Sequence, residues 1–209
     1  MFIVFEGVEG SGKSTQAARL SAWLGRLGIG HVLTREPGGT ALGEEIRRVL
    51  LHSGAVPDRS ELLLVLAARA AFVEQVVRPA LARGDVVISD RYELSSLAYQ
   101  GHGRGLRLDQ VRRVNAFATG YLRPDVTILL DVDPQEGAAR RSRAGLGSDR
   151  IERAGDEFHD AVGRAYRLLS ESEPGISVVS GAGPADAVEQ RVRSLLHERF
   201  PETFPAGQG

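Results

Sequence analysis

A glycine-rich segment near the amino terminus carries the residues whose chemistry is easiest to interpret. Its pattern, Gly-x4-Gly-Lys-Ser, is typical of a loop whose backbone N–H groups surround phosphate oxygens. Lys13 can reach the outer phosphates of a nucleotide, and the Ser14 hydroxyl can ligate Mg²⁺. Lys13 is also the only lysine among 26 basic residues, so an ammonium occurs only where such a loop requires one. We therefore predict a nucleoside triphosphate site. Its loop residues are Gly7, Val8, Glu9, Gly10, Ser11, Gly12, Lys13 and Ser14.

A phosphate loop alone leaves the class of protein open. A switch GTPase reads guanine with an Asn-Lys-x-Asp motif, but the only asparagine of this chain is Asn115 and the only lysine is Lys13. A guanine reader of that form is therefore excluded, and a mechanical ATPase normally needs a longer chain. The sequence favours a small phosphoryl-transfer enzyme, which must hold an acceptor in line with the γ-phosphate.

Two arginines follow predicted strands on the side of the sheet where the phosphate loop lies. Arg35 follows the strand 31–34, and Arg91 comes shortly after the strand 86–89. Ligands of open α/β sheets collect beyond the carboxyl ends of the strands, so both guanidiniums are candidates for holding a second phosphate. The alternative is that each forms an ordinary surface salt bridge, and the sequence alone does not decide between the two.

An acid near the phosphate loop is expected to hold Mg²⁺, usually through water. Asp90 directly follows an apolar strand, in the position where P-loop proteins keep such an acid. Asp131 and Asp133 compete for this role because they end another apolar strand. We prefer Asp90 because Arg91 adjoins it, so the predicted metal ligands are Ser14 and Asp90.

Residues 140–153 hold five arginines around two glycines. Guanidiniums this close repel one another unless anions or carboxylates lie among them, and glycines allow the segment to move. We predict an Arg-rich lid over about 141–153 that supplies the transition-state cation, because the phosphate loop contains no arginine. A solvated connection between helices is the alternative. The residues are Arg140, Arg141, Arg143, Arg150 and Arg153, with Gly145 and Gly147.

Strand and helix patterns alternate along the chain. Apolar and β-branched runs predict strands at 2–5, 31–34, 86–89, 126–132 and 176–179. Apolar residues at three- and four-residue spacing predict helices after the phosphate loop and at 41–51, 60–83, 93–100, 109–119, 134–142, 155–172 and 184–199. Pro79 should kink the helix at 60–83 or break it just before the proline. Nearly unbroken apolar inner strands indicate a parallel sheet covered on both faces. The predicted fold is a P-loop three-layer α/β/α domain with a five-stranded parallel sheet.

The composition is that of one folded domain. A chain of 209 residues with 42% hydrophobic residues can bury a core but is too short for two full-sized domains. We expect a single domain over 1–200 and a flexible tail over 201–209. The absence of cysteine excludes disulfides and favours a reducing compartment, so we expect a cytoplasmic protein. A net charge of −1 argues against general nucleic-acid binding, and the longest apolar run, 62–68, is too short to span a membrane.

Several motifs together resemble the bacterial thymidylate kinases, a branch of the nucleoside-monophosphate kinases. The resemblance extends from Phe2 to about Phe200. The runs at 35–40 and 90–101 separate this family from adenylate, guanylate and shikimate kinases, which share only the phosphate loop. The motifs are Phe-Glu-Gly-Val-Glu-Gly-Ser-Gly-Lys-Ser at 5–14, Thr-Arg-Glu-Pro-Gly-Gly-Thr at 34–40, Ala-Ala-Arg at 67–69, Asp-Arg-Tyr at 90–92, Ser-Ser at 95–96, Ala-Tyr-Gln-Gly at 98–101, Arg-Pro-Asp at 123–125, Leu-Asp-Val at 130–132 and Asp-Arg-Ile-Glu at 149–152.

The resemblance implies that the γ-phosphoryl group of ATP is transferred to dTMP with Mg²⁺, which gives dTDP and ADP for dTTP synthesis. It also implies a homodimer. Two other functions stay open at this point. One is a kinase for dUMP or another pyrimidine monophosphate, and the other is a nucleotide-binding regulator without catalytic turnover.

The resemblance also assigns roles in the acceptor site. Arg35 and Arg91 resemble the clamp on the dTMP phosphate, and Arg69 resembles the hydrogen-bond donor to thymine. Glu9 resembles the acid near the deoxyribose 3′-hydroxyl. The remainder of the implied nucleoside pocket is Ser96, Tyr99 and Gln100.

The lid arginines resemble those of kinases that keep the catalytic cation in the lid. The candidates for that cation are Arg143 and Arg150, while Arg140 or Arg141 would stack on adenine. The catalytic residues implied in this way are Lys13, Glu9, Arg91, Arg143 and Arg150.

One position departs from the family. The family usually stacks an aromatic ring on thymine four residues before the base-reading arginine, and here that position is Val65. Val65 and Arg69 are one helical turn apart and should share a face. Phe72, one turn further, could supply the ring, or the base could rest on aliphatic surface. Losing a ring contact of about 0.5–1.5 kcal/mol weakens dTMP binding up to about tenfold, which affects affinity and base selectivity rather than the reaction.

Overall fold

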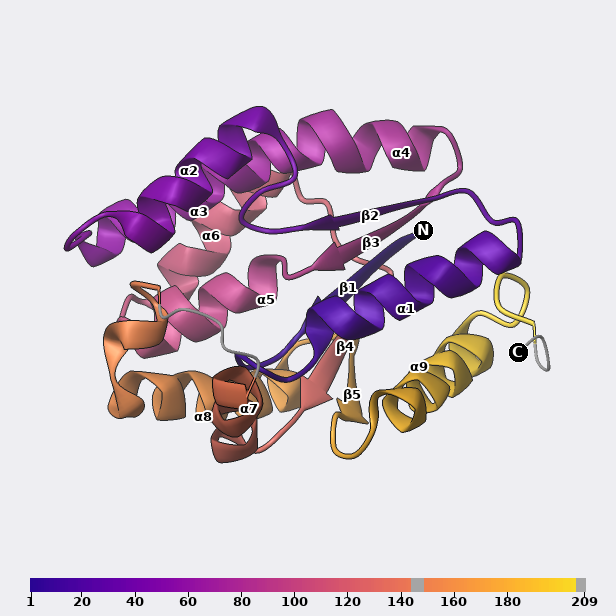
Figure 1. Ribbon diagram of the computed structural model, residues 1–209. Coiled ribbons are helices and arrows are strands. Elements are labelled where there is room, and N and C mark those ends of the chain that lie inside the picture. Colours follow the sequence, from indigo (N-terminus) through magenta and orange to yellow (C-terminus); the bar gives the residue numbers. More distant parts are fainter. Residues whose placement is uncertain (144–148, 206–209) are drawn as a thin grey trace.

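A parallel five-stranded sheet forms the centre of the computed structural model, which describes residues 1–143 and 149–205 (Figure 1). The strand order is β2-β3-β1-β4-β5, and every neighbouring pair is parallel. All five predicted strands are present, and the predicted α/β fold class is confirmed. The strands are β1 (Phe2–Glu6), β2 (His31–Arg35), β3 (Val86–Asp90), β4 (Val126–Asp131) and β5 (Ile176–Ser180).

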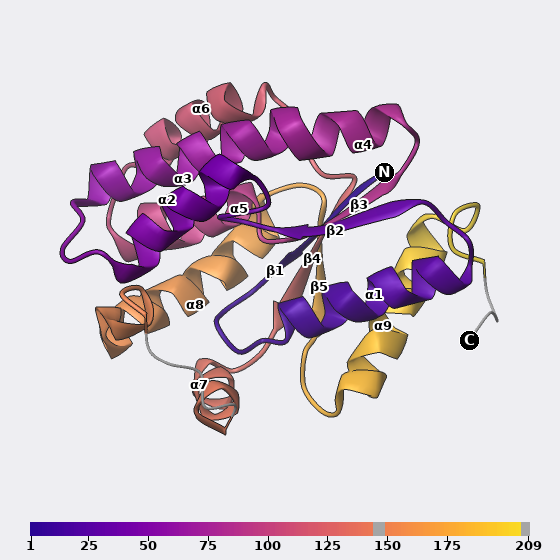
Figure 2. The same ribbon diagram turned by 45° about the horizontal axis from the view of Figure 1, so that its top comes forward.

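Helices cover both faces of this sheet. They are α1 (Lys13–Arg26), α2 (Ala41–His52), α3 (Asp58–Phe72), α4 (Arg78–Ala82), α5 (Glu93–Ser96), α6 (Leu108–Thr119), α7 (Pro134–Arg143), α8 (Asp156–Ser172) and α9 (Ala185–Arg199), with a 3-10 turn at Glu152–Ala154. Figure 2 shows α3, α4 and α6 on one side of the sheet and α1 and α9 on the other. Within residues 1–143 and 149–205, no helix is long and apolar enough to cross a membrane.

The alternation of side chains along β1 explains the three layers. Every residue of β1 is buried. Ile3 and Phe5 join the core under α1 and α9, whereas Phe2 and Val4 join the core on the opposite face. A strand that is buried on both faces reads as an unbroken apolar run, which is the pattern that predicted it.

The predicted helix at 60–83 is interrupted just before Pro79, as expected. α3 is followed by a π-helical turn at Val73–Val77, and Pro79 lies in the first turn of α4. Proline provides no backbone N–H for the preceding turn, so the regular hydrogen-bond ladder cannot run through it. The predicted helix at 93–100 is also irregular, because α5 continues into a π-helical turn at Leu97–Gly103.

The phosphate loop follows β1, the strand at which the chain stops adding strands on one side of the sheet and begins adding them on the other. β1 pairs with β3 on one side and with β4 on the other. Connections on the two sides diverge there, which opens a crevice beyond the carboxyl end of β1. Asp90 is in register with both Phe5 and Arg35. The loop after β1, Asp90 and Arg35 therefore meet at one edge of the sheet.

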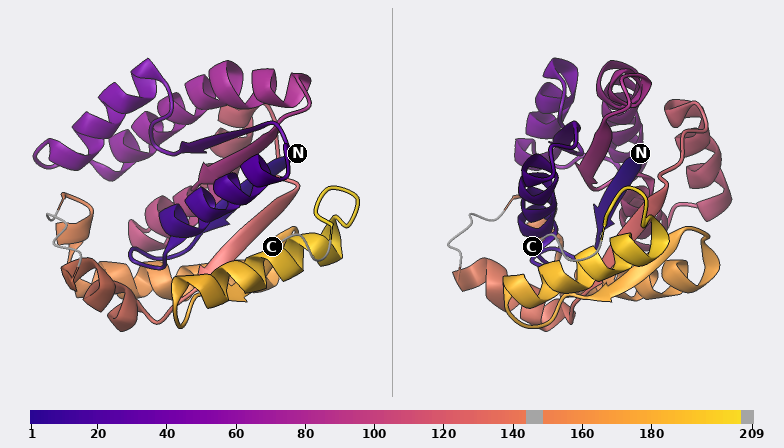
Figure 3. Two further views of the ribbon diagram at one scale, coloured as in Figure 1. Left: turned by 45° about the vertical axis from the view of Figure 1, so that its right-hand side comes forward. Right: turned by 90° about the vertical axis from the view of Figure 1, so that its right-hand side faces the viewer.

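The segment after α9 differs from the expected flexible tail. α9 runs beside α1 (Figure 3), and the chain then returns so that Phe204 is completely buried. Its ring stacks on Trp23 with centroids 5.6 Å apart. The tail prediction is therefore wrong for Phe204, because burying a phenyl ring outweighs the turn-forming residues around it. Residues 206–209 lie outside the described ranges.

Candidate active site

The loop between β1 and α1 has the backbone that its glycines predicted. Gly10 and Gly12 have φ angles of 77° and 94°, which side chains rarely tolerate. A Cβ on Gly10 would lie 2.1 Å from the carbonyl oxygen of Gly137, so α7 contacts the loop directly. The loop is thus a tight turn that leads into the positive end of the α1 dipole.

Lys13 lies at the centre of this loop. Its side chain is buried, and Nζ donates hydrogen bonds to the carbonyl oxygens of Gly7 at 3.1 Å and Val8 at 2.8 Å. Burial lowers the pKa of Lys13 to about 8, and the nearby Arg91 cation acts in the same direction. An anion that enters the loop would therefore stabilise the charged form of Lys13.

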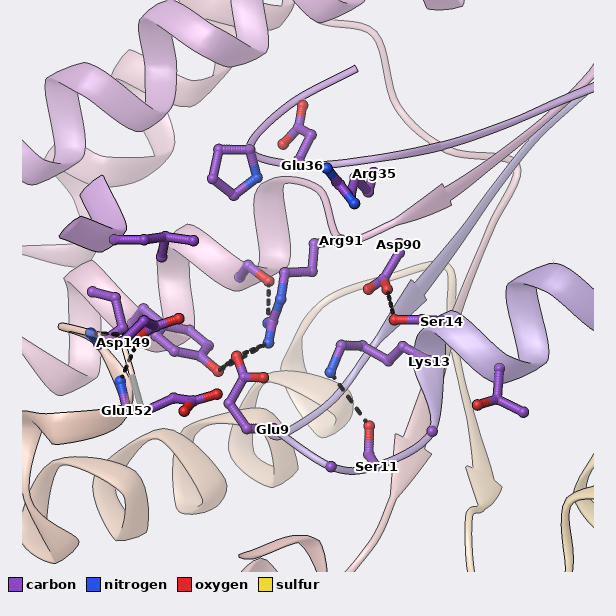
Figure 4. Close-up of a pocket in the computed structure, with 18 of the residues that line it drawn as sticks. Glu9, Ser11, Lys13, Ser14, Arg35, Glu36, Asp90, Arg91, Asp149 and Glu152 are labelled. Carbon is purple, nitrogen blue, oxygen red and sulfur yellow. Dashed lines mark hydrogen bonds and ion pairs between the residues drawn. The ribbon is translucent and has the colours of Figure 1, made fainter. Parts of the chain in front are cut away.

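Ser14 and Asp90 are brought together as predicted. The Ser14 hydroxyl donates a hydrogen bond to Oδ2 of Asp90 (Figure 4). Asp131 instead lies 3.6 Å from Nε of Arg167, and Asp133 caps α7 by accepting the backbone N–H of Gln135 at 2.8 Å. Neither of these competing acids lines the cavity described next. The structure thus places Asp90, rather than the two alternatives, beside Ser14 in that cavity.

A single cavity of about 720 Å³ connects the phosphate loop to the face of α3. It gathers most of the predicted ATP-, metal- and dTMP-binding residues from β2, β3, α3, the segment after β3 and the loop itself. Those that line it are Glu9, Gly10, Ser11, Gly12, Lys13, Ser14, Arg35, Val65, Arg69, Asp90, Arg91, Ser96, Tyr99, Gln100 and Arg140.

Arg91 is a cation that four side chains hold in the cavity. It has a left-handed backbone conformation with φ of 80°, unusual for a residue with a side chain. Its guanidinium pairs with Glu9 and donates to Tyr99 Oη at 3.1 Å, Ser95 Oγ at 3.0 Å and Tyr166 Oη at 3.2 Å (Figure 4). Burial opposes its charge, but Glu9 together with Tyr99, Tyr166 and Glu6 outweighs burial and raises the pKa of Arg91 well above its usual value. The result is a permanently charged group in a fixed position.

Arg35 is held more loosely than Arg91. Its side chain is 56% exposed and lies 3.3 Å from Glu44. Figure 4 shows Arg35 on the opposite side of Asp90 from Ser14. The two predicted phosphate-clamp arginines thus reach the same cavity, one rigid and one free to adjust.

Arg69 is almost completely buried and is oriented by protein acceptors. It donates to Glu36 at 2.7 Å, Ser96 at 2.8 Å and the carbonyl oxygen of Tyr92 at 2.8 Å, and also to Asn115. These bonds occupy four of its five N–H groups within the described part of the chain. The remaining N–H belongs to Nη2, with which Arg69 can meet a ligand in the cavity.

Val65 and Phe72 lie in different surroundings. Val65 lines the cavity, whereas Phe72 is completely buried in the core and packs against Tyr92, with centroids 6.4 Å apart. The prediction that Phe72 shares the pocket fails because Phe72 lies about 10 Å further along α3 than Val65, at the end of the helix. Seven residues make nearly two full turns, so the two side chains point in similar directions, but Phe72 is buried in the core cluster that contains Phe2, Val87 and Tyr92. The wall of the cavity at this place is aliphatic.

The lid prediction is met only in part by the described residues. Arg140 lines the cavity, and its Nη2 donates to Glu136 at 2.5 Å and to the carbonyl oxygen of Gly181 at 3.0 Å. The side chains of Arg141 and Arg143 lie outside the described residues. Arg150 is not among the residues that line the cavity; its guanidinium pairs with Glu61 at 2.7 Å and donates to the carbonyl oxygen of Leu50 at 2.8 Å.

Three buried carboxylates that support the site were missed by sequence reasoning. They are Glu6, Glu36 and Glu61. Glu6 accepts four hydrogen bonds, including those from the backbone N–H of Tyr92 at 2.8 Å and from Tyr166 Oη at 2.9 Å. Burial raises the pKa of Glu36 to about 7, against the effect of its partner Arg69. Glu6 left a signal in the sequence as an acid that ends an apolar strand, and Glu36 lies within the motif at 34–40, but neither was assigned a role.

Comparison with known proteins identifies the family. The family model described as thymidylate kinase matches residues 5–192. The chain belongs to the thymidylate kinase family. It is 48% identical to the thymidylate kinase of Desulforudis audaxviator over 95% of this chain and 93% of that protein. It is 47% identical to the thymidylate kinase of Synechococcus sp. strain JA-3-3Ab over 98% and 99% of the two chains.

A solved structure supports the same assignment. The crystal structure of thymidylate kinase from Ehrlichia chaffeensis superposes with a TM-score of 0.77 at 30% identity and covers 94% of this chain and 98% of that chain. The protein is therefore an enzyme of the nucleoside-monophosphate kinase class with a thymidylate kinase fold.

Proposed function

We propose that the protein transfers the γ-phosphoryl group of ATP to dTMP, giving dTDP and ADP. One observation carries the proposal from the structure: Lys13 and Arg91 lie in one cavity, close enough for Arg91 to lower the pKa of Lys13. Two cations in one cavity repel each other unless anions lie between them. The phosphates of a donor and an acceptor nucleotide supply those anions. Membership of the thymidylate kinase family supports dTMP over dUMP as the acceptor.

The acceptor brings its own nucleophile. A phosphate monoester loses its second proton with a pKa of about 6, so the attacking oxygen of dTMP is already deprotonated near pH 7. Arg35 and Arg91 favour this dianion and orient it, and Glu9 and Tyr99 orient Arg91. No side chain has to act as a general base, so these residues contribute position and charge rather than proton transfer.

The donor occupies the other end of the cavity in this proposal. The N–H groups of residues 7–14 hold the phosphates, and Lys13 moves from its carbonyl partners onto the outer phosphates. Arg140, beside Gly181, contacts the adenine end. Arg143 remains the predicted lid cation, although its side chain lies outside the described residues.

Ser14 and Asp90 are the residues that would hold Mg²⁺. A hydroxyl and a carboxylate in hydrogen-bond contact are hard oxygen donors of the type that Mg²⁺ uses together with water and phosphate. When bound, the ion neutralises charge on the transferring phosphate. The proposed task of the two side chains is to fix the position of that charge at the start of α1.

The remaining cavity residues define the nucleoside pocket. We assign recognition of the thymine base to Arg69, Ser96 and Gln100, and contact with the deoxyribose 3′-hydroxyl to Glu9. Val65 gives the base an aliphatic wall. Because base contacts and phosphate contacts come from different elements, base selectivity and phosphate binding can be altered separately by mutation.

The test is an ADP-release assay with ATP, Mg²⁺ and a panel of nucleoside monophosphates. We expect turnover that depends on dTMP. Preferred turnover with dUMP or another pyrimidine monophosphate would support the second candidate function. Binding of ATP and dTMP without acceptor-dependent turnover would support a regulatory protein. A nucleoside-monophosphate panel at equal concentration separates the first two results, and equilibrium binding of ATP and dTMP by calorimetry recognises the third.

We also propose a cytoplasmic homodimer. Large apolar side chains remain exposed on α3 and around the end of α6: Leu63 is 61% exposed, Phe117 87% and Tyr121 80%. Exposed apolar groups of this size favour association of two copies. Sedimentation at micromolar concentration tests the dimer, and a monomeric mass would contradict it.

A further inference from the structure

The carboxylate of Glu61 connects the nucleoside pocket with the segment that follows the predicted lid. Glu61 lies in the first turn of α3 and is completely buried. Its Oε1 accepts a hydrogen bond from Nε2 of Gln100 at 2.8 Å, and its Oε2 lies 2.7 Å from Nη2 of Arg150. Arg104 donates to both oxygens, from Nε to Oε1 at 3.3 Å and from Nη2 to Oε2 at 3.1 Å. One carboxylate therefore joins a proposed base-contacting residue to a proposed catalytic arginine.

Arg150 is fixed in this position by several further contacts. Its Nε donates to the carbonyl oxygen of Leu50 at 2.8 Å, and its backbone N–H donates to the carbonyl oxygen of Leu51 at 3.0 Å. Both acceptors belong to the last turn of α2, where a cation is favoured by the helix dipole. Asp149 holds the following turn by accepting two backbone N–H groups at 2.8 and 2.9 Å. The side chain of Arg150 is only 13% exposed, so its charge interacts with protein groups rather than with solvent.

The contact with Glu61 determines how the Gln100 amide is oriented. An ionised carboxylate only accepts hydrogen bonds, so it holds the nitrogen end of the amide and leaves the oxygen end for other partners. Burial raises the pKa of Glu61, but the donors Gln100, Arg104 and Arg150 outweigh burial and lower it below its usual value. The carboxylate thus stays ionised, and the amide of Gln100 keeps one orientation.

An amide with a fixed orientation can read a pyrimidine. Thymine presents an N–H donor at N3, whereas cytosine presents an acceptor there. An amide whose oxygen faces the base favours the first, and a flipped amide favours the second. The residues that keep Glu61 charged and correctly turned therefore affect which base is accepted.

We propose, on the basis of the proposed function above, that Arg150 is a positioning residue of the nucleoside pocket, which acts through Glu61 on Gln100 rather than on the transferring phosphoryl group. Removing the Arg150 guanidinium takes away the 2.7 Å contact at Oε2 and leaves Arg104, which donates to both oxygens of Glu61, as the cation at this carboxylate. The carboxylate then shifts toward Arg104, and Gln100 loses its fixed orientation. Because a buried charge pair remains, the fold should survive the substitution.

The experiment compares Arg150→Met with the wild-type enzyme. We expect the Kd and the KM for dTMP to rise about three- to tenfold, the usual effect of losing one hydrogen-bond contribution. We expect the preference for dTMP over dCMP in kcat/KM to fall by a similar factor. The kcat with dTMP and the KM for ATP should stay within about twofold. The matched control is Arg107→Met, because Arg107 is 74% exposed and pairs with Asp109 outside the cavity; this variant should change none of these quantities.

A second variant tests the route through Gln100. In a Gln100→Ala background, Arg150→Met should cause no further loss of dTMP affinity, because the amide that it positions is already absent. Additive losses would overturn the proposed route. A fall in kcat of a hundredfold or more with unchanged dTMP affinity would return Arg150 to the role of catalytic cation, and unchanged affinity and unchanged kcat would show that it has neither role.

Failure of the proposed function is recognised separately. Equilibrium binding of dTMP by calorimetry does not depend on turnover. If the wild-type protein binds dTMP but does not phosphorylate it, the proposed activity fails while the comparison of Kd values still decides the role of Arg150. If the wild-type protein does not bind dTMP, both proposals fail.

Discussion

Lys13 is a cation whose protonation depends on what the cavity contains. Burial and the neighbouring Arg91 lower its pKa to about 8, so part of the population is neutral in mildly alkaline solution. Phosphates placed beside Nζ favour the charged form and raise this pKa again. Nucleotide binding and proton uptake are therefore linked at this residue.

The first prediction concerns the pH dependence of ATP binding. At pH 8 about half of the Lys13 side chains are neutral, so binding ATP should take up about half a proton per site, and almost none at pH 6. ATP affinity should consequently weaken as pH rises above 8. Titration calorimetry in buffers with different ionisation enthalpies measures the uptake. Lys13→Arg is the control, because an arginine stays charged and should remove the uptake at pH 8. Equal uptake by the two proteins would contradict the assignment to Lys13.

The second prediction concerns the aliphatic wall of the base pocket. Val65 lines the cavity one turn before Arg69, so a ring at this position would extend over the space beside the Arg69 guanidinium. Val65→Phe should lower the KM for dTMP up to about tenfold, or leave it level, because an aromatic contact adds about 0.5–1.5 kcal/mol. Steady-state kinetics with dTMP measures it. Leu168→Phe on α8, 56% exposed, is the control and should have no effect. A large rise in KM for Val65→Phe alone would show that the base lies elsewhere.

Many residues that line the cavity were predictable from sequence, whereas the residues that hold them were not. Residues 9–14 of the phosphate loop, Asp90, Arg91 and Ser96 all line the cavity, while Gly7 and Val8 do not. Glu36 and Glu61 were missed because their partners, Arg69 and Arg150, are 33 and 89 residues away in sequence. Long-range packing creates such pairs, and neither motif nor periodicity records it.

At the scale of elements, strands were predicted more accurately than helices. A buried parallel strand has a distinctive apolar run, and all five were located within one or two residues. The helices at 60–83 and 93–100 kept their positions but contain π-helical turns at Val73–Val77 and Leu97–Gly103. A π turn changes hydrogen bonding without changing the apolar pattern much, so only the break at Pro79 was visible in the sequence. The apolar pattern also does not show where along one face of α3 the cavity ends and the core begins, so the burial of Phe72 in the core was not visible in the sequence.

The third prediction concerns the contact between the phosphate loop and α7. Gly10 and Gly28 have similar backbones, with φ of 77° and 70°, but a Cβ would meet the Gly137 carbonyl oxygen at 2.1 Å only at Gly10. Both alanine substitutions should cost about 1–2 kcal/mol of stability through backbone strain. Only Gly10→Ala should also raise the KM for ATP, by tenfold or more, because the loop must separate from α7. Denaturant unfolding and ATP kinetics measure the two effects. Equal KM values for the two variants would contradict the proposed role of the contact between the loop and α7.

At the scale of the whole molecule, the nucleotide-binding and structural ends of the sheet are separate. The cavity lies beyond the carboxyl ends of the strands, and the core under α1 and α9 continues to the opposite end, where the chain returns after α9. α1 links the two, because it begins at Lys13 and carries Trp23 in its last turns. Changes at the far end should therefore affect stability without affecting catalysis.

The final prediction uses this separation. Phe204 is completely buried and stacks on Trp23, the only tryptophan of the chain, at 5.6 Å. Phe204→Ala should lower the free energy of unfolding by about 3–5 kcal/mol, because it removes a buried ring and leaves a cavity. The KM values should not change, since Trp23 lies about 15 Å along α1 from Lys13. Urea unfolding followed by tryptophan emission reports both the lost free energy of unfolding and the new environment of Trp23. The control is Leu168→Ala at an exposed position, which should lose less than about 0.5 kcal/mol. Unchanged emission together with unchanged stability in Phe204→Ala would mean that the segment after α9 does not pack on α1, and the sequence-based expectation of a loose tail would then apply to Phe204 as well.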